Sequence, residues 1–191
     1  MASHGQTRQR IVATAAELFR RQGMHATGMN QILREGNAPK GSLYFHFPGG
    51  KNQLAAEAVA TSAAAMADRL RELLDPVASV EDSVTAMLTE LAAGLADSDF
   101  TAGCPIATVA LEADSPQVNE SCRAGYASWT AVIADWLGGV GVPEAEIADL
   151  ATTVLATVEG GLLLACTARD TAPLSTVGRA VTRLVTLAIP D

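Results

Sequence analysis

Apolar side chains recur at three- and four-residue spacings along almost the whole chain of 191 residues. Ile11, Ala15 and Phe19 illustrate this pattern, which places apolar side chains on one face of an α-helix. Aromatic residues, which strands favour, make up only 4% of the composition. The sequence therefore predicts an all-α protein of nine helices and no strands, at about 8–22, 28–35, 39–47, 52–74, 79–96, 104–113, 116–137, 144–169 and 175–188.

Residues with strong preferences for helix ends mark several of these boundaries. Thr7 and Thr27 are the expected N-caps of the first two helices, and Ser79 is the expected cap of the fifth. Gly36-Asn37 tolerates the left-handed backbone of a tight turn, and Pro39 is expected to open the third helix. Three short helices joined in this way predict a helix-turn-helix unit.

The third predicted helix has an apolar face and a polar face. Leu43 and Phe47, at an i, i+4 spacing, are expected to face the core. The outward side would then carry groups that can donate to phosphate oxygens or base edges, and a glycine that lets the backbone approach DNA: Lys40, Ser42, Tyr44, His46 and Gly41.

Charge is divided unevenly along the chain, although the net charge is −8. The first 55 residues hold seven basic and two acidic side chains, a net charge of +5, and the remainder carries −13. Both lysines, Lys40 and Lys51, lie in the first segment. Such asymmetry indicates a local binding surface for a polyanion on an otherwise acidic protein.

These motifs together resemble the DNA-binding head of TetR-type transcriptional regulators over about residues 7–58. The resemblance rests on IVATAAELF at 11–19 with Gly23, TGMNQI at 27–32, KGSLYFHF at 40–47, Lys51 and Leu54. It implies a DNA-binding domain at 5–58, a regulatory domain at 59–191, and DNA contacts by Asn30, Gln31, Lys40, Gly41, Ser42, Tyr44, His46 and Lys51. Gly28, where the family commonly has Thr or Ser, and the long PGGK segment at 48–51 depart from the usual pattern.

The remainder of the chain is similar to one branch of that family, the regulators of the LmrA and YxaF type. The similarity lies in AGCPIA at 102–107, EGG at 159–161 and DTAPL at 170–174. It implies a homodimer that pairs through the last two long helices, with Leu155, Leu162, Leu163, Val181 and Leu184 at the interface. It also implies a cavity for a small-molecule effector, for which the candidate residues are Met87, Leu91, Cys104, Ile106, Tyr126, Trp129 and Glu159.

No pattern in the sequence points to an enzyme, a cofactor or a metal site. The three cysteines lack metal-ligand spacing, and neither G-x-S-x-G, a P-loop nor H-E-x-x-H occurs. Free thiols and the polar N-terminal segment favour a cytoplasmic protein. The apolar segment 150–168 has the length of a membrane span, but Glu159 near its middle favours a buried helix of a soluble core.

Three alternatives remain open from the sequence. Glu159 either pairs with a neighbouring helix or recognises a cationic or donor-rich ligand, because a buried carboxylate needs a partner. Tyr126 and Trp129 are either core residues or line the effector cavity. The whole chain is expected to be a ligand-released repressor of a palindromic operator. The alternatives are an activator of the same fold, and a small-molecule carrier or an enzyme with a vestigial head.

Overall fold

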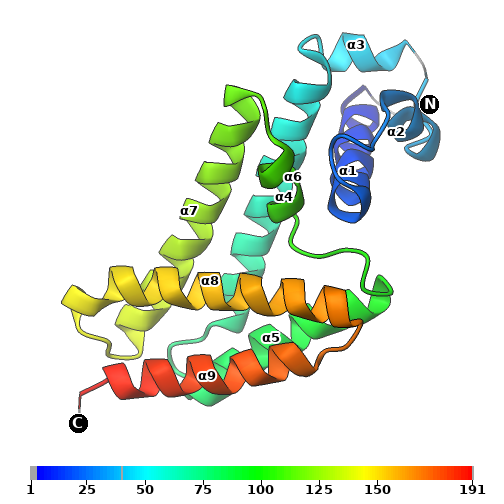
Figure 1. The fold of residues 1–191 in the computed structure, drawn as a ribbon. Coiled ribbons are helices and arrows are strands. Elements are labelled where there is room, and N and C mark those ends of the chain that lie inside the picture. The colour runs from blue at the N-terminus through cyan, green and yellow to red at the C-terminus, as the bar shows by residue number, and fades with distance from the viewer. Residues whose placement is uncertain (1–3, 40, 191) are drawn as a thin grey trace. The chain divides into compact units, whose positions relative to one another are not determined.

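The computed structural model of the protein describes residues 4–39 and 41–190 (Figure 1). Nine α-helices and no strand occur in these ranges, as the sequence predicts. The helices are α1 (His4–Gln22), α2 (Met29–Glu35), α3 (Ser42–His46), α4 (Gly50–Leu73), α5 (Val80–Asp97), α6 (Ala107–Glu112), α7 (Pro116–Gly139), α8 (Glu144–Ala168) and α9 (Ala172–Ala188).

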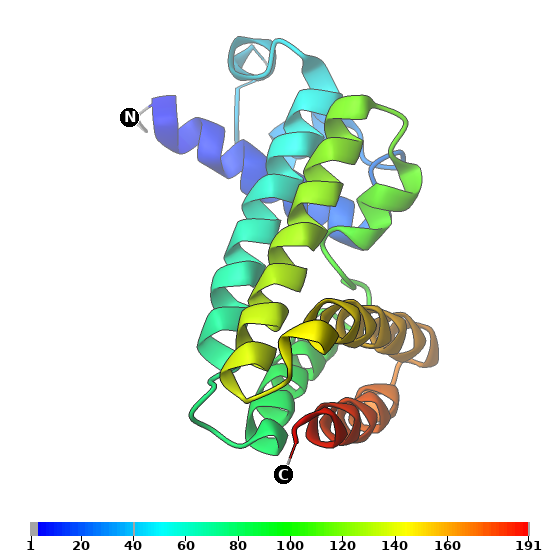
Figure 2. The same cartoon turned by 90° about the vertical axis from the view of Figure 1, so that its left-hand side faces the viewer.

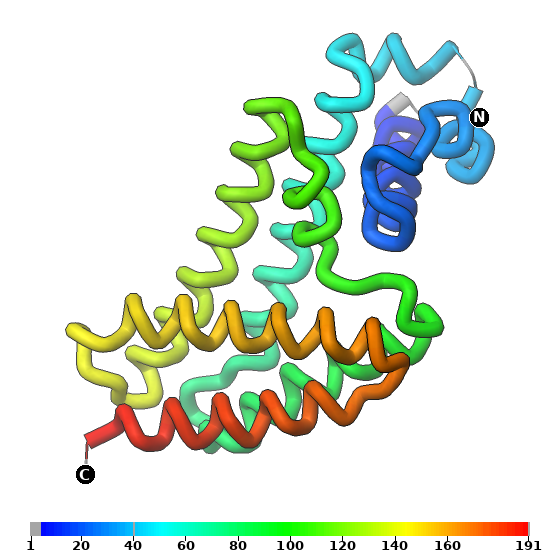
Figure 3. The backbone as a smooth tube through the Cα atoms, in the orientation of Figure 1, coloured from blue at the N-terminus to red at the C-terminus, as the bar shows by residue number. Residues whose placement is uncertain are grey.

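The helices form two compact units. Of the described residues, the first unit contains 4–39, 41–64 and 104–126, and the second contains 65–103 and 127–190. Both α4 and α7 contribute residues to each unit. In the first unit, the chain passes through α1, α2 and α3 in succession, and the tube in Figure 3 shows this path.

The first unit has a core drawn from all three of its N-terminal helices. Ile11 and Phe19 of α1, Ile32 of α2, Leu43 of α3 and Phe47 immediately after α3 are almost completely buried. The expected inward positions of Leu43 and Phe47 are therefore confirmed. Their burial holds the short α3 in place, which its own few hydrogen bonds could not do.

Two expected N-caps in this unit are wrong. Thr7 lies inside α1, which begins at His4. The N-cap of α2 is Gly28, without a side-chain hydrogen bond, because the buried Thr27 hydroxyl instead donates to the Gly23 carbonyl at 2.6 Å. The side-chain hydroxyl competes for local backbone acceptors, and here the preceding turn provides one.

The connection between α2 and α3 contains a tight turn, as predicted, but of Gly36 and Asn37 only Asn37 adopts the left-handed conformation. Asn37 has φ +46°, and the Ala38 amide donates to the Leu33 carbonyl at 2.9 Å. The third helix begins at Ser42 instead of Pro39. Pro39 still shapes its start, because its carbonyl accepts from the Ser42 amide at 2.9 Å.

The second unit is built around α9, which packs against both α5 and α8. Figure 2 shows α8 and α9 side by side and nearly end-on. Val84 of α5, Val154 of α8 and Val181 of α9 are buried here. The Ser79 hydroxyl accepts from the Asp82 amide at 3.0 Å, which confirms the cap at the start of α5.

One helix in the described part of the chain, α8, is long and apolar enough to cross a membrane by length and composition. Core helices of soluble proteins meet the same criterion, so this is weak evidence for a membrane span. Leu163 and Leu164 of α8 are exposed, so residues 4–39 and 41–190 leave that side of the helix uncovered. A helix that is apolar on several sides requires cover on several sides.

Candidate DNA-binding site

Two aromatic side chains stand out from α3. Tyr44 is 72% exposed and Phe45 is 71% exposed, whereas their neighbours Leu43 and Phe47 are 2% and 0% exposed. The i, i+4 apolar pair therefore fixes which face of α3 points outward. The sequence predicts Tyr44 on this face but not Phe45, because the phenylalanine ring carries no hydrogen-bonding group.

The polar residues of α3 are partly engaged within the chain. The Ser42 hydroxyl donates to the Pro39 carbonyl at 2.6 Å, which leaves its oxygen lone pairs as acceptors. The half-buried His46 ring lies edge-on to the Phe45 ring, with the centroids 5.0 Å apart. A Cβ atom added to Gly41 would meet nothing within 4 Å, so the backbone is open to a close approach there.

The candidates on α2 differ in how free they are. Asn30 is exposed at the start of the helix. Gln31 is half-buried, and its amide bridges two side chains, accepting from Gln22 at 3.0 Å and donating to Glu35 at 3.0 Å. Asn30 can thus reach a ligand directly, whereas Gln31 would have to exchange existing hydrogen bonds to do so.

The two lysines expected to contact DNA are placed differently. Lys51 is half-buried in the first turn of α4 and donates to the His25 carbonyl at 3.5 Å. Lys40 lies outside the described residues. The PGGK segment preceding α4 contains Gly50 with φ +68°, and the Gly49 amide donates to the Gln53 side chain at 2.9 Å.

One arginine of α1 supports the end of α3. The Arg8 guanidinium lies over the Phe47 ring, 5.2 Å from its centroid, and pairs with Glu57 of α4. An arginine stacked on an aromatic face while paired with a carboxylate here joins α1, α4 and the residue that follows α3. Arg8 therefore positions the helix-turn-helix unit.

The turn between α1 and α2 is held by a carboxylate from α6. Glu112 accepts a hydrogen bond from the His25 backbone amide at 2.7 Å. Gly23 has φ +84°, and a Cβ atom there would lie 2.4 Å from a carboxylate oxygen of Glu112. This contact joins parts of the first unit that are 87 residues apart in sequence. No local sequence pattern signals it.

The seven candidates for the effector cavity belong to different units. Cys104, Ile106 and Tyr126 lie in the first unit, where the Tyr126 hydroxyl is 3.9 Å from the Cys104 sulfur. The candidates in the second unit are Met87, Leu91, Trp129 and Glu159, of which Met87 and Trp129 are buried. Of the interface candidates, Leu163 and Leu184 are exposed, Leu155 is half-buried, and Leu162 and Val181 are buried within the chain.

All three cysteines are at least partly buried, and one accepts backbone hydrogen bonds next to the start of α6. The Cys104 sulfur accepts from the backbone amides of Ile106 and Ala107, each at 3.4 Å. Burial raises the pKa of the Cys122 and Cys166 thiols above the ordinary value. Within residues 4–39 and 41–190, no group of three or more histidine, cysteine or acidic side chains is placed to hold a metal ion.

The first three helices share a packed core and leave one face of α3 exposed, which defines a helix-turn-helix protein. Comparisons with known proteins identify the family of helix-turn-helix proteins. Residues 11–58 match the family described as bacterial regulatory proteins, tetR family, and residues 81–180 match the C-terminal domain of LmrA/YxaF-like transcriptional regulators. The HTH-type transcriptional regulator LmrA of Bacillus subtilis is 36% identical over 174 residues, covering 90% of this chain and 93% of its own. YxaF of the same organism is 34% identical, covering 97% and 98%.

Solved structures agree with this assignment. A TetR transcriptional regulator from Chloroflexus aurantiacus superposes with a TM-score of 0.78 at 29% identity, covering 97% of each chain. Regulatory protein TetR from Rhodobacter sphaeroides has the same fold, with a TM-score of 0.82 at 20% identity, covering 92% of this chain and 96% of its own. The chain belongs to the TetR family of DNA-binding transcriptional regulators, in the branch with an LmrA/YxaF-like C-terminal domain. Its relatives are regulators, not enzymes.

Proposed function

We propose that the protein is a cytoplasmic homodimeric repressor whose two heads enter successive major grooves of a palindromic operator. A small-molecule inducer would release it. Half-sites read by such dimers lie about 34–36 Å apart. Family membership supports DNA binding. The assignment of the surface that reads DNA rests on one observation: Tyr44 and Phe45 of α3 are exposed, whereas Leu43 and Phe47 are buried.

The reading surface is proposed to comprise residues of α2, α3 and the start of α4. Tyr44, Phe45 and Asn30 have exposed side chains, and Gly41 is open to close approach. The other proposed contacts are Gln31, Lys40, Ser42, His46 and Lys51. Lys51, which now contacts the His25 carbonyl, would turn toward phosphate when DNA is bound.

Charge is proposed to confine DNA to the head. The first 55 residues have a net charge of +5 and the rest −13, so phosphate is attracted to one part of the chain and repelled by the other. Each DNA phosphate that the protein neutralises makes the slope of the logarithm of the binding constant against the logarithm of the salt concentration more negative by roughly 0.9. A head domain at 5–58 and a regulatory domain at 59–191 fit this division, as do the family matches at 11–58 and 81–180.

Dimer formation is proposed to use the exposed leucines of α8 and α9. Leu163, Leu164, Leu184 and Leu187 are all exposed in the single chain. Leu155 would add to this surface, whereas Leu162 and Val181 would support it from inside. The two helices pack against each other, and large apolar side chains left exposed on neighbouring helices favour a protein interaction site there.

Induction is proposed to work by population shift. A ligand held by the candidates Met87, Leu91, Cys104, Ile106, Tyr126, Trp129 and Glu159 would favour a conformation in which the two heads no longer match the operator. Moving such an equilibrium from 1:99 to 99:1 requires about 5.5 kcal/mol of differential binding.

Binding to the DNA upstream of its own gene tests the proposal. We expect the wild-type protein to bind one upstream segment with an affinity that falls steeply with salt, measured by fluorescence anisotropy. Tyr44→Ala and Lys40→Ala should each abolish specific binding while leaving the far-UV circular dichroism unchanged. Arg123→Ala, on an exposed position of α7, is the control and should bind as the wild type does.

Three results would contradict parts of this proposal. No specific binding by the wild type at moderate salt would favour a carrier with a vestigial head. Wild-type affinity in both head variants would move the reading surface elsewhere. Increased transcription from a reporter when the protein is present would make it an activator.

A further inference from the structure

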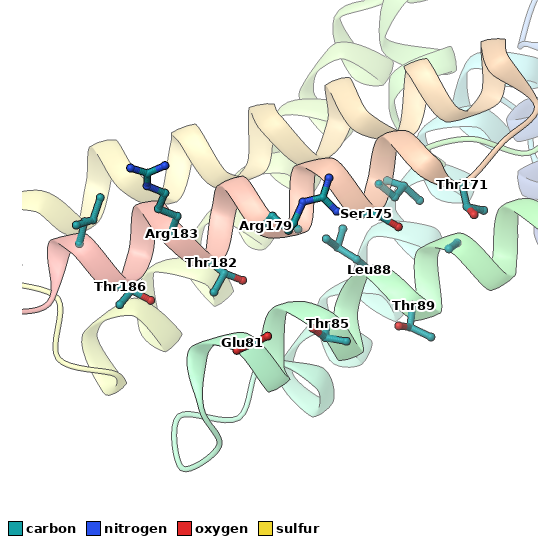
Figure 4. A pocket seen from close by; sticks show the side chains of 14 residues that line it. Glu81, Thr85, Leu88, Thr89, Thr171, Ser175, Arg179, Thr182, Arg183 and Thr186 are labelled. Carbon is teal, nitrogen blue, oxygen red and sulfur yellow. The ribbon is translucent and has the colours of Figure 1, made fainter.

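A groove of about 630 Å³ runs between α5 and α9 in the second unit (Figure 4). Its volume falls in the range of about 300–1,000 Å³ that small-molecule sites occupy. The lining residues are Glu81, Thr85, Leu88, Thr89, Ala92, Thr171, Leu174, Ser175, Gly178, Arg179, Thr182, Arg183, Thr186 and Leu187. None of the seven residues proposed for the effector cavity is among them.

The floor of the groove is apolar and firmly packed. Leu88 of α5 and Leu174 of α9 are buried there. The helices α5 and α9 approach each other at Gly178, where an added Cβ atom would lie 2.8 Å from a methyl carbon of Leu88. Glycine thus allows the helices to approach closely at the floor, and the groove opens above it.

Hydroxyl groups line both walls. Figure 4 shows Thr182 and Thr186 pointing from α9 toward α5, which contributes Thr85 and Thr89. Among the described residues, these four hydroxyls have no hydrogen-bond partner, in contrast to the threonines of α8, which donate to the carbonyl four residues earlier: Thr152, Thr153, Thr157 and Thr167. The groove hydroxyls are therefore available to a bound molecule.

Two arginines lie at the α9 rim. Arg179 donates to the Thr176 hydroxyl at 3.1 Å, and neither Arg179 nor Arg183 has an ion-pair partner in the described part of the chain. Most other arginines are paired; Arg69, for example, contacts both Glu72 and Glu90. The region after residue 55 carries −13, so two adjacent unpaired cations are unusual there. They attract an anionic group.

We propose that the α5–α9 groove binds an amphipathic organic anion. Its carboxylate or sulfonate group contacts the guanidinium groups of Arg179 and Arg183. Its apolar body lies over Leu88 and Leu174, and its polar substituents meet the threonine hydroxyls. The groove shares no residue with the proposed DNA-binding surface or with the proposed effector cavity, and it shares only Leu187 with the proposed dimer surface. Its test therefore does not depend on DNA binding.

Fluorescent probes test the proposal on the full-length protein without DNA. The anionic probe is 8-anilinonaphthalene-1-sulfonate, and the uncharged probe of similar size is N-phenyl-1-naphthylamine. The double variant Arg179→Gln/Arg183→Gln should weaken binding of the sulfonate roughly tenfold, because two charge-assisted contacts are lost at a solvent-exposed rim. It should leave binding of the uncharged probe unchanged. Thr182→Trp, which fills the groove, should weaken both.

The matched control is Arg71→Gln/Arg123→Gln, which removes the same total charge from exposed positions on α4 and α7. It should bind both probes as the wild type does. Equal sulfonate affinity in the two double variants would overturn the proposal, and so would failure of the wild type to bind the sulfonate. A change in the dimer dissociation constant of Arg179→Gln/Arg183→Gln, without a change in probe binding, would assign the groove to a second copy and also overturn it.

Discussion

Phe45 and Phe47 lie two residues apart, yet one ring is 71% exposed and the other is 0% exposed. Phe45→Ala should leave the free energy of unfolding nearly unchanged, within about 0.5 kcal/mol, because little buried surface is lost. It should lower operator affinity, since an apolar ring on the reading surface can contact a thymine methyl group. Phe47→Ala should cost about 3–5 kcal/mol of stability.

Urea denaturation and anisotropy titration together check this pair. The two substitutions are identical in chemistry, so the position of the ring is the only difference between them. If Phe45→Ala binds the operator as tightly as the wild type, Phe45 does not contact DNA. Loss of stability in Phe45→Ala comparable to that in Phe47→Ala would contradict the orientation of α3.

Thiol reactivity is a second property set at single residues. Burial raises the pKa of Cys122 and Cys166, so the reactive thiolate is scarcer near neutral pH than in an unfolded chain. Both cysteines should react slowly with iodoacetamide at pH 7, and faster as the pH rises toward the raised pKa. Mass spectrometry of timed samples measures this. Labelling of either residue as rapidly as in denaturant would be inconsistent with its burial.

At the scale of elements, the turn between α1 and α2 depends on α6. Gly23→Ala should destabilise the protein by roughly 1–3 kcal/mol, because alanine is strained at φ +84° and its Cβ atom would displace Glu112. Glu112→Gln keeps an acceptor for the His25 amide and should be mild. Glu112→Ala should increase hydrogen exchange at that amide.

A double-mutant cycle separates the two effects at this turn. In Gly23→Ala/Glu112→Ala the steric clash is gone but the backbone strain remains, so the stability lost should be less than the sum of the two single losses. Strict additivity in urea denaturation would mean that Gly23 and Glu112 act independently, contrary to their contact.

The sequence predicted elements better than the contacts between them. Periodicity located all nine helices of the described residues, and the Leu43–Phe47 spacing correctly oriented α3. Helix ends were less accurate: α9 begins at Ala172, earlier than the expected 175, because Pro173 is tolerated in the first turn of a helix. Contacts such as Glu112 with the α1–α2 turn join distant segments and leave no local pattern.

The candidate DNA-binding site shows the same difference: the sequence predicts the element better than its contacts. Composition and motif predict which helix reads DNA, but whether a side chain is free depends on its neighbours in space. Gln31 is occupied by Gln22 and Glu35, and Lys51 by the His25 carbonyl, none of which periodicity reveals.

At the scale of the whole molecule, the exposed leucines predict dimer formation. Leu163→Glu/Leu184→Glu should give a monomer at micromolar concentration by light scattering, because charges would be buried without partners in the interface. Leu111→Glu is the control, since Leu111 is 90% exposed on α6 and should leave the dimer intact. A monomeric wild type, or a dimer of the double variant, would contradict this interface.

The proposed pairing through the leucines of α8 and α9 implies how temperature should act on the dimer. Pairing that depends on releasing water from apolar side chains weakens on cooling, whereas attraction between arginine and phosphate does not share this dependence. In dilute solution the dimer should therefore dissociate in the cold, whereas each DNA-binding head should keep its own affinity for DNA. Cooling would replace tight binding of the dimer to its operator with weak, independent binding of two monomers.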